Sequence, residues 1–224
     1  MSRRSYRQYC ATAHALDIVG ERWTLLLVRE LLTGPRRFGD LLAGLPGMGT
    51  GLLAARLKFL TEEGIVEQVT LPAPANTPAY AVTEAGAALE AAVLALADWG
   101  MTWALDEREP GEVFRAGWTV LAMRSAFNAE RAADLRAVYE FRIDDEVFHA
   151  AVVDGAIATV HGPAQRPDVV VATDGDTFRQ ILRGEPTTRG ATVTGDSSLL
   201  ARLPALFDWP EARERVSPAR PRWR

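Results

Sequence analysis

The chain has 224 residues, of which 48% are hydrophobic and 24% charged, and its formal net charge is −4. This balance excludes an intrinsically disordered chain and predicts a globular protein of one or two domains. No apolar run approaches the roughly 18 residues of a transmembrane helix, and the single cysteine excludes an internal disulfide. No apolar stretch follows the N-terminal arginines as in a secretory signal, so we expect a cytoplasmic protein without a membrane partner.

The charges are unevenly distributed along the chain. Residues 1–60 carry nine basic and four acidic side chains, whereas residues 61–109 carry one basic and nine acidic side chains. A positively charged segment is what contact with phosphate groups requires. The alternative is a chance clustering of arginines on a solvated surface.

Apolar residues recur at helical spacing over residues 13–32, which predicts one amphipathic helix there. The glycine and proline at positions 34–35 are expected to end it. Arg36 and Arg37 come immediately before the next helical segment, where they are well placed to contact backbone phosphates.

The stretch over residues 38–63 predicts two short helices joined by a tight, glycine-rich turn. The first helix is expected over residues 38–43, and the glycines and proline of residues 44–49 end it. Thr50 is a suitable N-cap for the second helix, which Gly64 stops in a left-handed conformation.

The second of these helices has two different sides. Leu53, Leu57 and Leu60 form an apolar stripe for the core, whereas the opposite side carries only small or polar residues. A helix of this kind can enter the major groove of DNA without a steric conflict. The alternative is an ordinary helical hairpin. The residues expected to contact double-stranded DNA are Arg36, Arg37, Thr50, Gly51, Ala54, Ala55, Arg56, Lys58, Asn76 and Thr77.

A β-hairpin is predicted after this helix. Strand-forming residues occupy positions 65–71 and 79–82, and the proline-rich segment between them predicts a stiff tip without charge. Three helices followed by such a hairpin make up a winged helix-turn-helix. Because the tip is uncharged, insertion of an arginine into the minor groove is not available to it.

Thr83 is the expected N-cap of a further helix that extends to about residue 106. Apolar residues on this helix repeat at spacings of four, three and seven residues, which is typical of a helix–helix seam. We therefore expect a homodimer, and the alternative is packing against the N-terminal helix of the same chain. The seam residues are Leu89, Val93, Leu96, Trp99 and Trp103.

Residues 8–103 resemble the HxlR-type winged-helix regulators of bacteria. The resemblance rests on Cys10, on the segments LDIVGERWT, RELLTGPRRFGDL, LPG and LLAARLKFL, and on the YxxTExG pattern that closes the wing. It implies a dimeric, DNA-binding transcription factor. Gly51 stands where this family often has a basic residue, and the uncharged wing is a second departure, so both features weaken the expected grip on DNA.

Cys10 aligns with a cysteine that some of these regulators use to sense electrophiles or oxidants, so the resemblance implies a redox-sensing role. Sensing requires a partly exposed thiolate near positive charge, and Arg3, Arg4 and Arg7 are close in sequence. Ala11 replaces the proline that usually follows this cysteine. A small buried cysteine is the alternative.

The composition changes at residues 110–111, where a proline and a glycine indicate a linker. The Asp154-Gly155 pair further along fits the two-residue turn of a hairpin. The expected elements are a helix over 117–133, a strand over 138–143, a hairpin over 147–161, a strand over 168–173, a helix from 174 or 176 to 184, an edge strand over 191–196 and a closing helix over 197–207.

Residues 135–207 resemble the sterol-carrier-protein-like domains through a strand, a capped helix, a short strand and a closing LARLPALF helix. The resemblance implies an antiparallel sheet covered by helices and, in many such domains, an apolar tunnel for acyl chains or sterols. The residues expected to line the tunnel and bind an apolar effector are Phe141, Phe148, Phe178, Leu182, Leu199, Leu203 and Phe207. A closed, structural domain is the alternative.

Catalytic patterns are weak. His14, His149 and His161 lack the spacing of metal ligands, and no histidine follows Ser197 to act as its base. Asp196 is better interpreted as an N-cap, and no phosphate-binding glycine motif is present. We therefore expect no metal, no cofactor and no enzymatic activity. An esterase built on Ser197, and a lipid carrier whose winged helix only dimerises, are the alternative functions.

These patterns together predict an α+β protein in three segments. They are a winged helix-turn-helix over residues 1–109, a sterol-carrier-protein-like domain over 110–210 and an arginine-rich tail over 211–224. In the expected mechanism, an apolar effector in the second segment changes the spacing of two recognition helices. That spacing must match DNA half-sites one helical turn, roughly 34 Å, apart.

Overall fold

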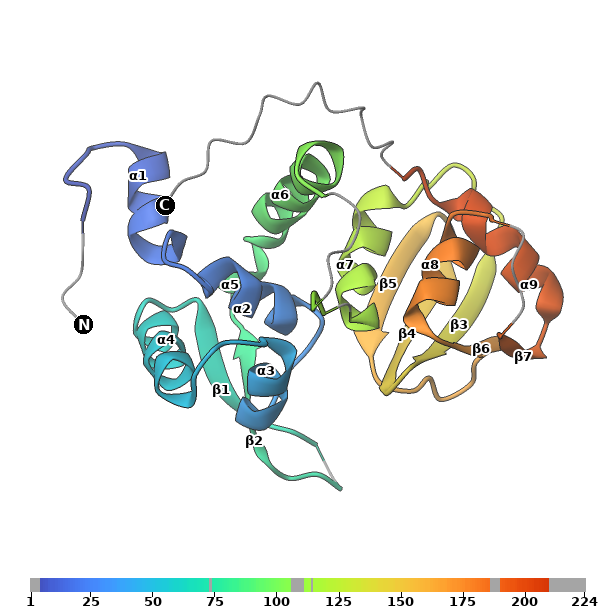
Figure 1. The fold of residues 1–224 in the computed structure, drawn as a ribbon, viewed down its shortest axis with the longest axis horizontal. Coiled ribbons are helices and arrows are strands. Elements are labelled where there is room, and N and C mark those ends of the chain that lie inside the picture. The colour runs from blue at the N-terminus through green and yellow to red at the C-terminus, as the bar shows by residue number, and fades with distance from the viewer. Residues whose placement is uncertain (1–4, 73, 106–110, 114, 186–189, 210–224) are drawn as a thin grey trace.

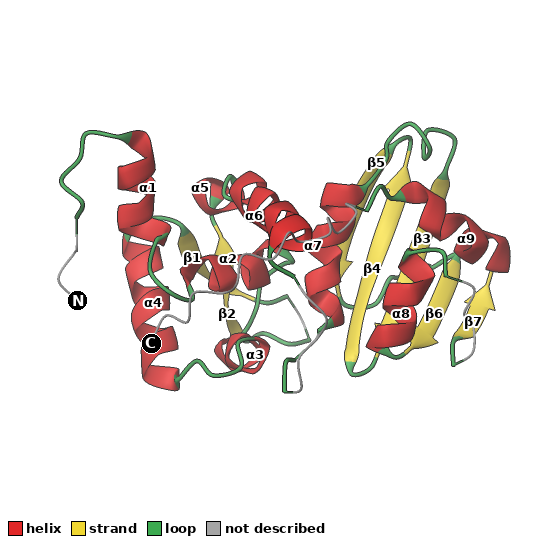
Figure 2. Ribbon diagram, turned by 45° about the horizontal axis from the view of Figure 1, so that its top comes forward, coloured by secondary structure: helices red, strands yellow, loops and turns green. Residues whose placement is uncertain are grey.

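The computed structural model describes residues 5–72, 74–105, 111–113, 115–185 and 190–209. A helical N-terminal half lies beside a C-terminal half built on one sheet, and helix α7 (Ala116–Ala126) stands between them (Figures 1 and 2). The expected linker proline at position 110 and the arginine-rich tail over 211–224 lie outside the described residues. Within the described ranges, no helix is both long and apolar enough to cross a bilayer.

The N-terminal half is a winged helix-turn-helix, as the sequence predicts. Its elements are α1 (Ala11–Val19), α2 (Thr24–Leu32), α3 (Phe38–Gly44), α4 (Thr50–Glu62), β1 (Val66–Thr70), β2 (Pro78–Val82), α5 (Glu84–Ala87) and α6 (Glu90–Trp103). The two strands pair antiparallel and form the wing, which projects away from the helices in Figure 1. Helices α3 and α4 are the helix-turn-helix, and α4 is the helix that the sequence leads us to expect in the major groove, called the recognition helix below.

The prediction of one helix over residues 13–32 is wrong, because the chain divides there into α1 and α2. Gly20 follows α1, and Trp23 takes a left-handed conformation with φ of 77° immediately before α2. Glycine weakens a helix by about 1 kcal/mol relative to alanine, and the left-handed region is costly for a bulky residue. Tertiary contacts of Glu21 and Trp23, described below, hold this break.

The helix predicted from Thr83 to about residue 106 is also divided. Thr83 caps it as expected, because its hydroxyl oxygen accepts a hydrogen bond from the backbone N–H of Gly86 at 3.1 Å. The first piece, α5, ends at Ala87, and two residues separate it from α6, which begins at Glu90. Leu89 lies between the two helical pieces and packs against the N-terminal core.

The core of the N-terminal half gathers residues from all parts of the winged helix. Leu53, Leu57 and Leu60 have exposed fractions of 0%, 1% and 0%, so the predicted apolar stripe of the recognition helix is confirmed. They pack with buried residues of α2, α3 and the wing, among them Leu27, Leu41 and Val66. The opposite side of α4 is thereby fixed toward the exterior.

The C-terminal half is a mixed sheet with helices. After α7, its elements are β3 (Arg136–Ile143), β4 (Glu146–Val153), β5 (Ala156–His161), β6 (Val169–Thr173), α8 (Gly175–Leu182), β7 (Thr192–Gly195), α9 (Ser197–Arg202) and the 3₁₀ helix η1 (Leu203–Leu206). The strand order is β5-β4-β3-β6-β7. The predicted Asp154-Gly155 turn is confirmed, because both residues have positive φ and Val153 pairs with Ala156.

The expectation of a wholly antiparallel sheet is wrong at one pairing, since β3 and β6 are parallel. After β5 the chain crosses the sheet through residues 162–168 and returns beyond β3, which reverses the pairing sense. The buried carboxylate of Glu140 holds this crossing, because Oε2 accepts from the backbone N–H of Ala164 at 2.9 Å. Its Oε1 lies 2.7 Å from Nη2 of Arg142.

The helix predicted over residues 117–133 is shorter in the structure and ends at Ala126. Phe127 is extended and forms an isolated bridge with Phe207. The backbone N–H of Asp208 also donates to the carbonyl oxygen of Ala126 at 2.7 Å. The end of the described chain therefore closes on the end of α7 and stops that helix.

Helix α7 contributes side chains to two separate cores. Val120 and Met123, both 0% exposed, belong to the core of the C-terminal half. Leu121, 3% exposed, belongs to the core of the winged helix. One helix therefore fixes the position of the winged helix relative to the sheet.

Arg124 on α7 joins three elements through its guanidinium group. Nε and Nη2 donate to the hydroxyl and carbonyl oxygens of Thr159 on β5, both at 2.6 Å. Nη1 donates to Oε1 of Glu90 on α6 at 3.1 Å and to the carbonyl oxygen of Leu32 on α2 at 3.4 Å. Thr159 is only 2% exposed, so loss of the guanidinium would leave buried acceptors without a partner.

We predict that Arg124→Ala lowers the free energy of unfolding by about 2 kcal/mol, because a buried acceptor left unpaired costs about 1–3 kcal/mol. Thermal unfolding should show a melting temperature lower by roughly 4–8 °C for a chain of this length. Arg136→Ala is the matched control, since its ion pair with Asp154 is exposed and should contribute under about 1 kcal/mol. Equal stability of the two variants would contradict the linking role of Arg124.

Candidate nucleic-acid interface

The outward side of recognition helix α4 is open along most of its length. Thr50, Gly51, Ala54 and Lys58 are exposed, and Ala55 is half-buried. A side chain added at Gly51 would meet no atom within 4 Å. The N-cap is Gly49, without a side-chain capping bond, so the prediction that Thr50 caps the helix is wrong by one residue. The surface formed by these five residues is called the α4 face below.

Arg56 does not share this surface. Its side chain is 9% exposed, and its Nη2 donates to Oε2 of Glu21 at 2.9 Å. Glu21 lies in the break between α1 and α2, so this ion pair ties the recognition helix to that break. Arg56 is expected from the sequence to contact DNA, but in the structure its side chain is buried and packs within the winged helix.

Arg36 and Arg37 lie before α3 and differ in their surroundings. Arg36 is half-buried, donates from Nη2 to the hydroxyl oxygen of Thr33 at 3.1 Å, and pairs through its backbone with Tyr80 of the wing. Thr33 lies against the C-terminal half, because its carbonyl oxygen accepts from the backbone N–H of His161 at 3.4 Å. Partial desolvation, and then the charge of Arg36, lower the pKa of His161. Arg37 is exposed, and its backbone N–H donates to the carboxylate of Asp40 at 3.3 Å. Of the two arginines, Arg37 is the one turned to solvent.

The wing tip offers polar groups without charge. Asn76 is exposed and has a left-handed backbone with φ of 40°, which asparagine tolerates in turns. Thr77 is half-buried, and its carbonyl oxygen accepts from the backbone N–H of Leu71 at 2.9 Å. Its hydroxyl oxygen is buried and has no hydrogen-bond partner among the described residues.

The predicted seam on α6 divides into two parts. Val93 is 9% exposed and Leu89 is half-buried, and both pack in the winged-helix core. Leu96, Trp99 and Trp103 remain 53%, 58% and 49% exposed. Large apolar side chains gathered on one helix surface mark an interaction site. The exposed part of the expected seam is therefore the second half of α6.

Cys10 is exposed and occupies the N-cap position of α1. The backbone N–H groups of Ala13 and Thr12, in the first turn of α1, lower the pKa of its thiol because they favour the thiolate. The nearby arginines at positions 3 and 4 lie outside the described residues. Exposure and a lowered pKa are both properties of reactive cysteines, and the alternative of a buried cysteine does not hold.

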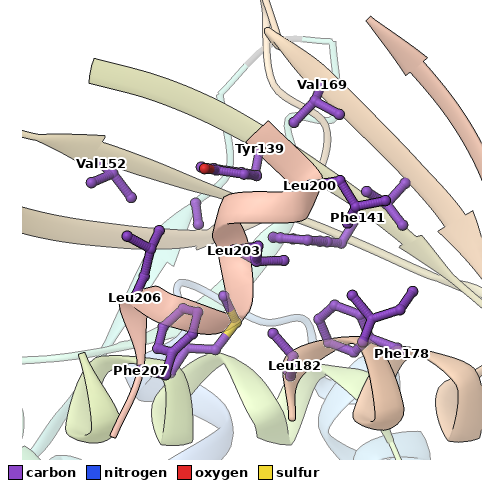
Figure 3. Packing of buried hydrophobic residues seen from close by; sticks show 14 of the residues in the cluster. Tyr139, Phe141, Val152, Val169, Phe178, Leu182, Leu200, Leu203, Leu206 and Phe207 are labelled. Atoms are coloured by element: carbon purple, nitrogen blue, oxygen red, sulfur yellow. The ribbon is translucent and has the colours of Figure 1, made fainter. Parts of the chain in front are cut away.

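Six of the seven residues expected to line a tunnel are buried in the core of the C-terminal half. Figure 3 shows Phe141, Phe178, Leu182, Leu203 and Phe207 among the packed side chains of this core. The rings of Phe141, Phe148 and Phe178 have centroids 5.1 to 5.7 Å apart and occupy the space between the sheet and α8. Leu199 is only partly buried and packs at the margin. Of the seven, Leu182 alone lines the cavity described next.

A cavity of about 670 Å³ lies between the two halves. Its walls come from α2 and the residue before it, the end of α3 and the turn after it, α6, α7, α8 and the loop residues at 105, 111–113 and 209. The residues that line it are Trp23, Leu26, Arg29, Gly44, Leu45, Pro46, Ala97, Met101, Leu105, Gly111, Glu112, Val113, Trp118, Thr119, Ala122, Arg179, Leu182, Arg183 and Trp209. Sequence reasoning missed this site apart from Leu182, because no periodicity indicates which elements of two domains face each other.

The residues weighed for catalysis are not brought together as a site. Ser197 is the first residue of α9, and Asp196 caps that helix as predicted. The carboxylate of Asp196 accepts from the hydroxyl and the backbone N–H of Ser198 at 2.6 and 2.9 Å, which lowers its pKa. No group of three or more metal-ligating side chains occurs in the described part of the chain.

Comparison with known proteins gives relatives for the N-terminal half. A family model for the HxlR-like helix-turn-helix matches residues 18–108. An uncharacterised HTH-type transcriptional regulator of Mycobacterium tuberculosis is 42% identical over 90 residues, which are 40% of this chain and 56% of the relative. The chain thus spans little more than half of that relative. The HTH-type transcriptional regulator YodB of Bacillus subtilis is 35% identical over 98 residues, which are 44% of this chain and 84% of YodB.

Among solved structures, the reduced form of YodB from Bacillus subtilis is 32% identical to the matched part. It covers 47% of this chain and 100% of the YodB chain, with a TM-score of 0.38.

We predict that Cys10 reacts with iodoacetamide at a lower pH in the folded protein than in urea, because the N–H groups of α1 stabilise only the folded thiolate. The pKa of the thiol is lower in the folded protein than in the unfolded protein. The thiolate therefore stabilises the fold at pH values above the unfolded pKa, and this stabilisation is lost as the pH falls through the folded pKa. Mass spectrometry of alkylation rates across pH measures both midpoints. Coincident midpoints would contradict the effect of the helix terminus.

Proposed function

The chain belongs to the HxlR-like family of helix-turn-helix proteins, and from this premise we propose that it is a dimeric regulator of transcription that binds double-stranded DNA through α4. The observation that carries the proposal is the α4 face, which is exposed, lined by small or polar residues and backed by a buried leucine stripe. Such a helix can approach base edges closely, because no bulky side chain separates its backbone from the groove.

The charged groups that remain near this face determine how the protein grips DNA. Lys58 is 79% exposed on α4, and Arg37 is exposed at the start of α3. We assign phosphate contacts to these two residues, with base contacts from Thr50 and Ala54. Asn76 at the wing tip can donate hydrogen bonds but adds no charge. The predicted interface is therefore weakly charged, and its affinity depends on two copies acting together.

We propose that two chains associate through the second half of α6. Leu96 and Trp99 are more than half exposed, and burial of such side chains stabilises a helix–helix interface by about 25 cal/mol per Å² of apolar area. A two-fold axis through this seam would present two recognition helices to successive turns of the major groove. Leu89 and Val93 support the helix from the core instead of forming the interface.

A second role, thiol-based sensing, is favoured by the position of Cys10. The thiol is exposed at the start of α1, and backbone N–H groups lower its pKa. Oxidation or alkylation there would add bulk at the N-terminal end of a helix that leads through the Glu21–Arg56 ion pair to α4. We propose that modification of this thiol changes DNA affinity.

The chain should bind the DNA upstream of its own gene in a salt-dependent manner, and Lys58→Ala should reduce the slope of log affinity against log salt by about one unit. Fluorescence anisotropy across a salt series measures the slope. Arg166→Ala is the control, because it removes the same charge from an exposed position in the C-terminal half. Equal slopes would remove Lys58 from the interface, and absence of salt-dependent binding would defeat the proposed function and favour a carrier protein.

Trp99→Glu should convert the dimer to single chains, because a carboxylate cannot be buried in an apolar seam without a large desolvation cost. Light scattering coupled to gel filtration gives the mass directly. Val160→Glu tests a similarly exposed apolar residue outside the seam and should leave the mass unchanged. A dimer that survives Trp99→Glu would place the interface elsewhere.

A further inference from the structure

We infer that the cavity between the two halves binds an amphipathic anion, an apolar molecule with one carboxylate or sulfonate group, and that this ligand alters the presentation of α4. The binding site is inferred from the geometry of the cavity. Only the effect of the ligand on DNA binding rests on the function proposed above. At about 670 Å³ the cavity falls within the range of small-molecule sites, roughly 300–1,000 Å³.

Most of the cavity wall is apolar and comes from both halves. Trp23 contributes from the position before α2 and Leu26 from α2 itself. Met101 comes from α6, Trp118 from α7 and Leu182 from α8. Leu26 is 42% exposed although it is aliphatic. An apolar ligand that covers this wall would remove such side chains from water, which supplies the main favourable term for binding.

The basic side chains in the wall decide the charge of the ligand. Arg179 and Arg183 lie four residues apart at the end of α8, so they are neighbours on one side of the helix. Within the described residues, neither guanidinium has an ion pair or a side-chain hydrogen bond. Two like charges at this spacing repel each other, and an anion between them would relieve the repulsion. Glu112 also lines the cavity and has its own partner, so the basic groups outnumber it.

The third arginine of the cavity wall, Arg29, is already paired within the protein and is not available to bind the anionic group of the ligand. Its Nη2 donates to Oε1 of Glu30 at 2.8 Å, and its guanidinium lies 4.3 Å from the ring centroid of Trp118. Trp118 also donates from Nε1 to the same oxygen of Glu30 at 2.8 Å. Gly44 permits this arrangement, because a side chain at that position would begin 2.8 Å from Oε2 of Glu30. This cluster is a rigid wall against which a planar or alkyl body can pack.

The cavity reaches the turn that precedes the recognition helix. Leu45 and Pro46 line it directly, four to five residues before α4 begins at Thr50. Trp23, whose left-handed backbone is costly for a bulky residue, lines the cavity and also approaches this turn. A side chain built on Gly47 would begin 3.7 Å from its ring. A ligand that moves the Trp23 ring therefore acts on the turn that sets the orientation of α4.

The test uses the full chain and dodecanoate, dodecanol and dodecylamine as probes that share one alkyl body and differ in charge. Isothermal titration calorimetry should give the tightest binding for dodecanoate, with the uncharged alcohol weaker and the cation weakest. Arg179→Gln combined with Arg183→Gln should weaken dodecanoate by at least about tenfold and leave dodecanol unchanged, because only the ion pairing is removed. Arg166→Gln is the charge-matched control and should leave dodecanoate binding as it is.

Ala122→Trp is a second variant, which fills the cavity from α7 and should abolish binding of both dodecanoate and dodecanol. Circular dichroism and thermal unfolding show whether the Ala122→Trp variant is folded. If it is not folded, the double arginine variant tests the site independently. Equal affinity for the three probes, or dodecanoate binding that survives both variants, would overturn the anion site.

The effect on DNA is measured separately, by anisotropy with and without dodecanoate. A change in DNA affinity of fivefold or more in the parent chain, absent from the arginine variant, is the expected result for a coupling of about 1 kcal/mol. Unchanged DNA affinity at saturating dodecanoate would overturn the regulatory part of the inference. A chain that binds dodecanoate as expected but never binds DNA would defeat the proposed function and leave the anion site standing.

Discussion

Helix α7 must bury two different sides in two different cores, and the placement of the two halves follows from this constraint. Val120 and Met123 are taken up by the sheet, and Leu121 is taken up by the winged helix. Since a helix is rigid over three turns, these contacts fix the sheet relative to α2 and α6. Arg124 also fixes the orientation of α7, because its guanidinium group has five N–H donors and can satisfy acceptors on three elements only when the helix has one orientation.

The same constraint explains why a cavity lies beside α7. The elements of both halves converge on this helix, but the side of it that carries Trp118 and Ala122 is not covered by either core. Arg29, Glu30 and Trp118 form part of the wall on that side, and their polar groups are hydrogen-bonded to one another. A ligand there would therefore contact the helix that joins the halves and the turn that orients α4 at the same time.

The expected DNA-binding residues fall into two groups, those whose exposure follows from a local sequence pattern and those whose burial depends on a distant residue. The exposed positions of α4 could be predicted, because the leucine stripe fixes which side is buried and leaves the opposite side to solvent. Arg56 could not, because its burial depends on Glu21, which is 35 residues distant and lies in a helix break that periodicity does not show. Similarly, the sequence predicts that the seam of α6 is apolar, but it does not divide the seam into Val93 in the core and Trp99 on the surface.

The sequence by itself determined the local elements of this protein: the winged helix-turn-helix, the Asp154-Gly155 hairpin turn, and the caps at Thr83 and Asp196. These features depend on residues a few positions apart, whose spacing and side-chain chemistry act through the local backbone. Tertiary structure alone decided the parallel pairing of β3 with β6, the shared role of α7 and the cavity between the halves. Each of these depends on which surfaces meet, and an apolar periodicity reports that a surface is buried but does not identify the surface that covers it.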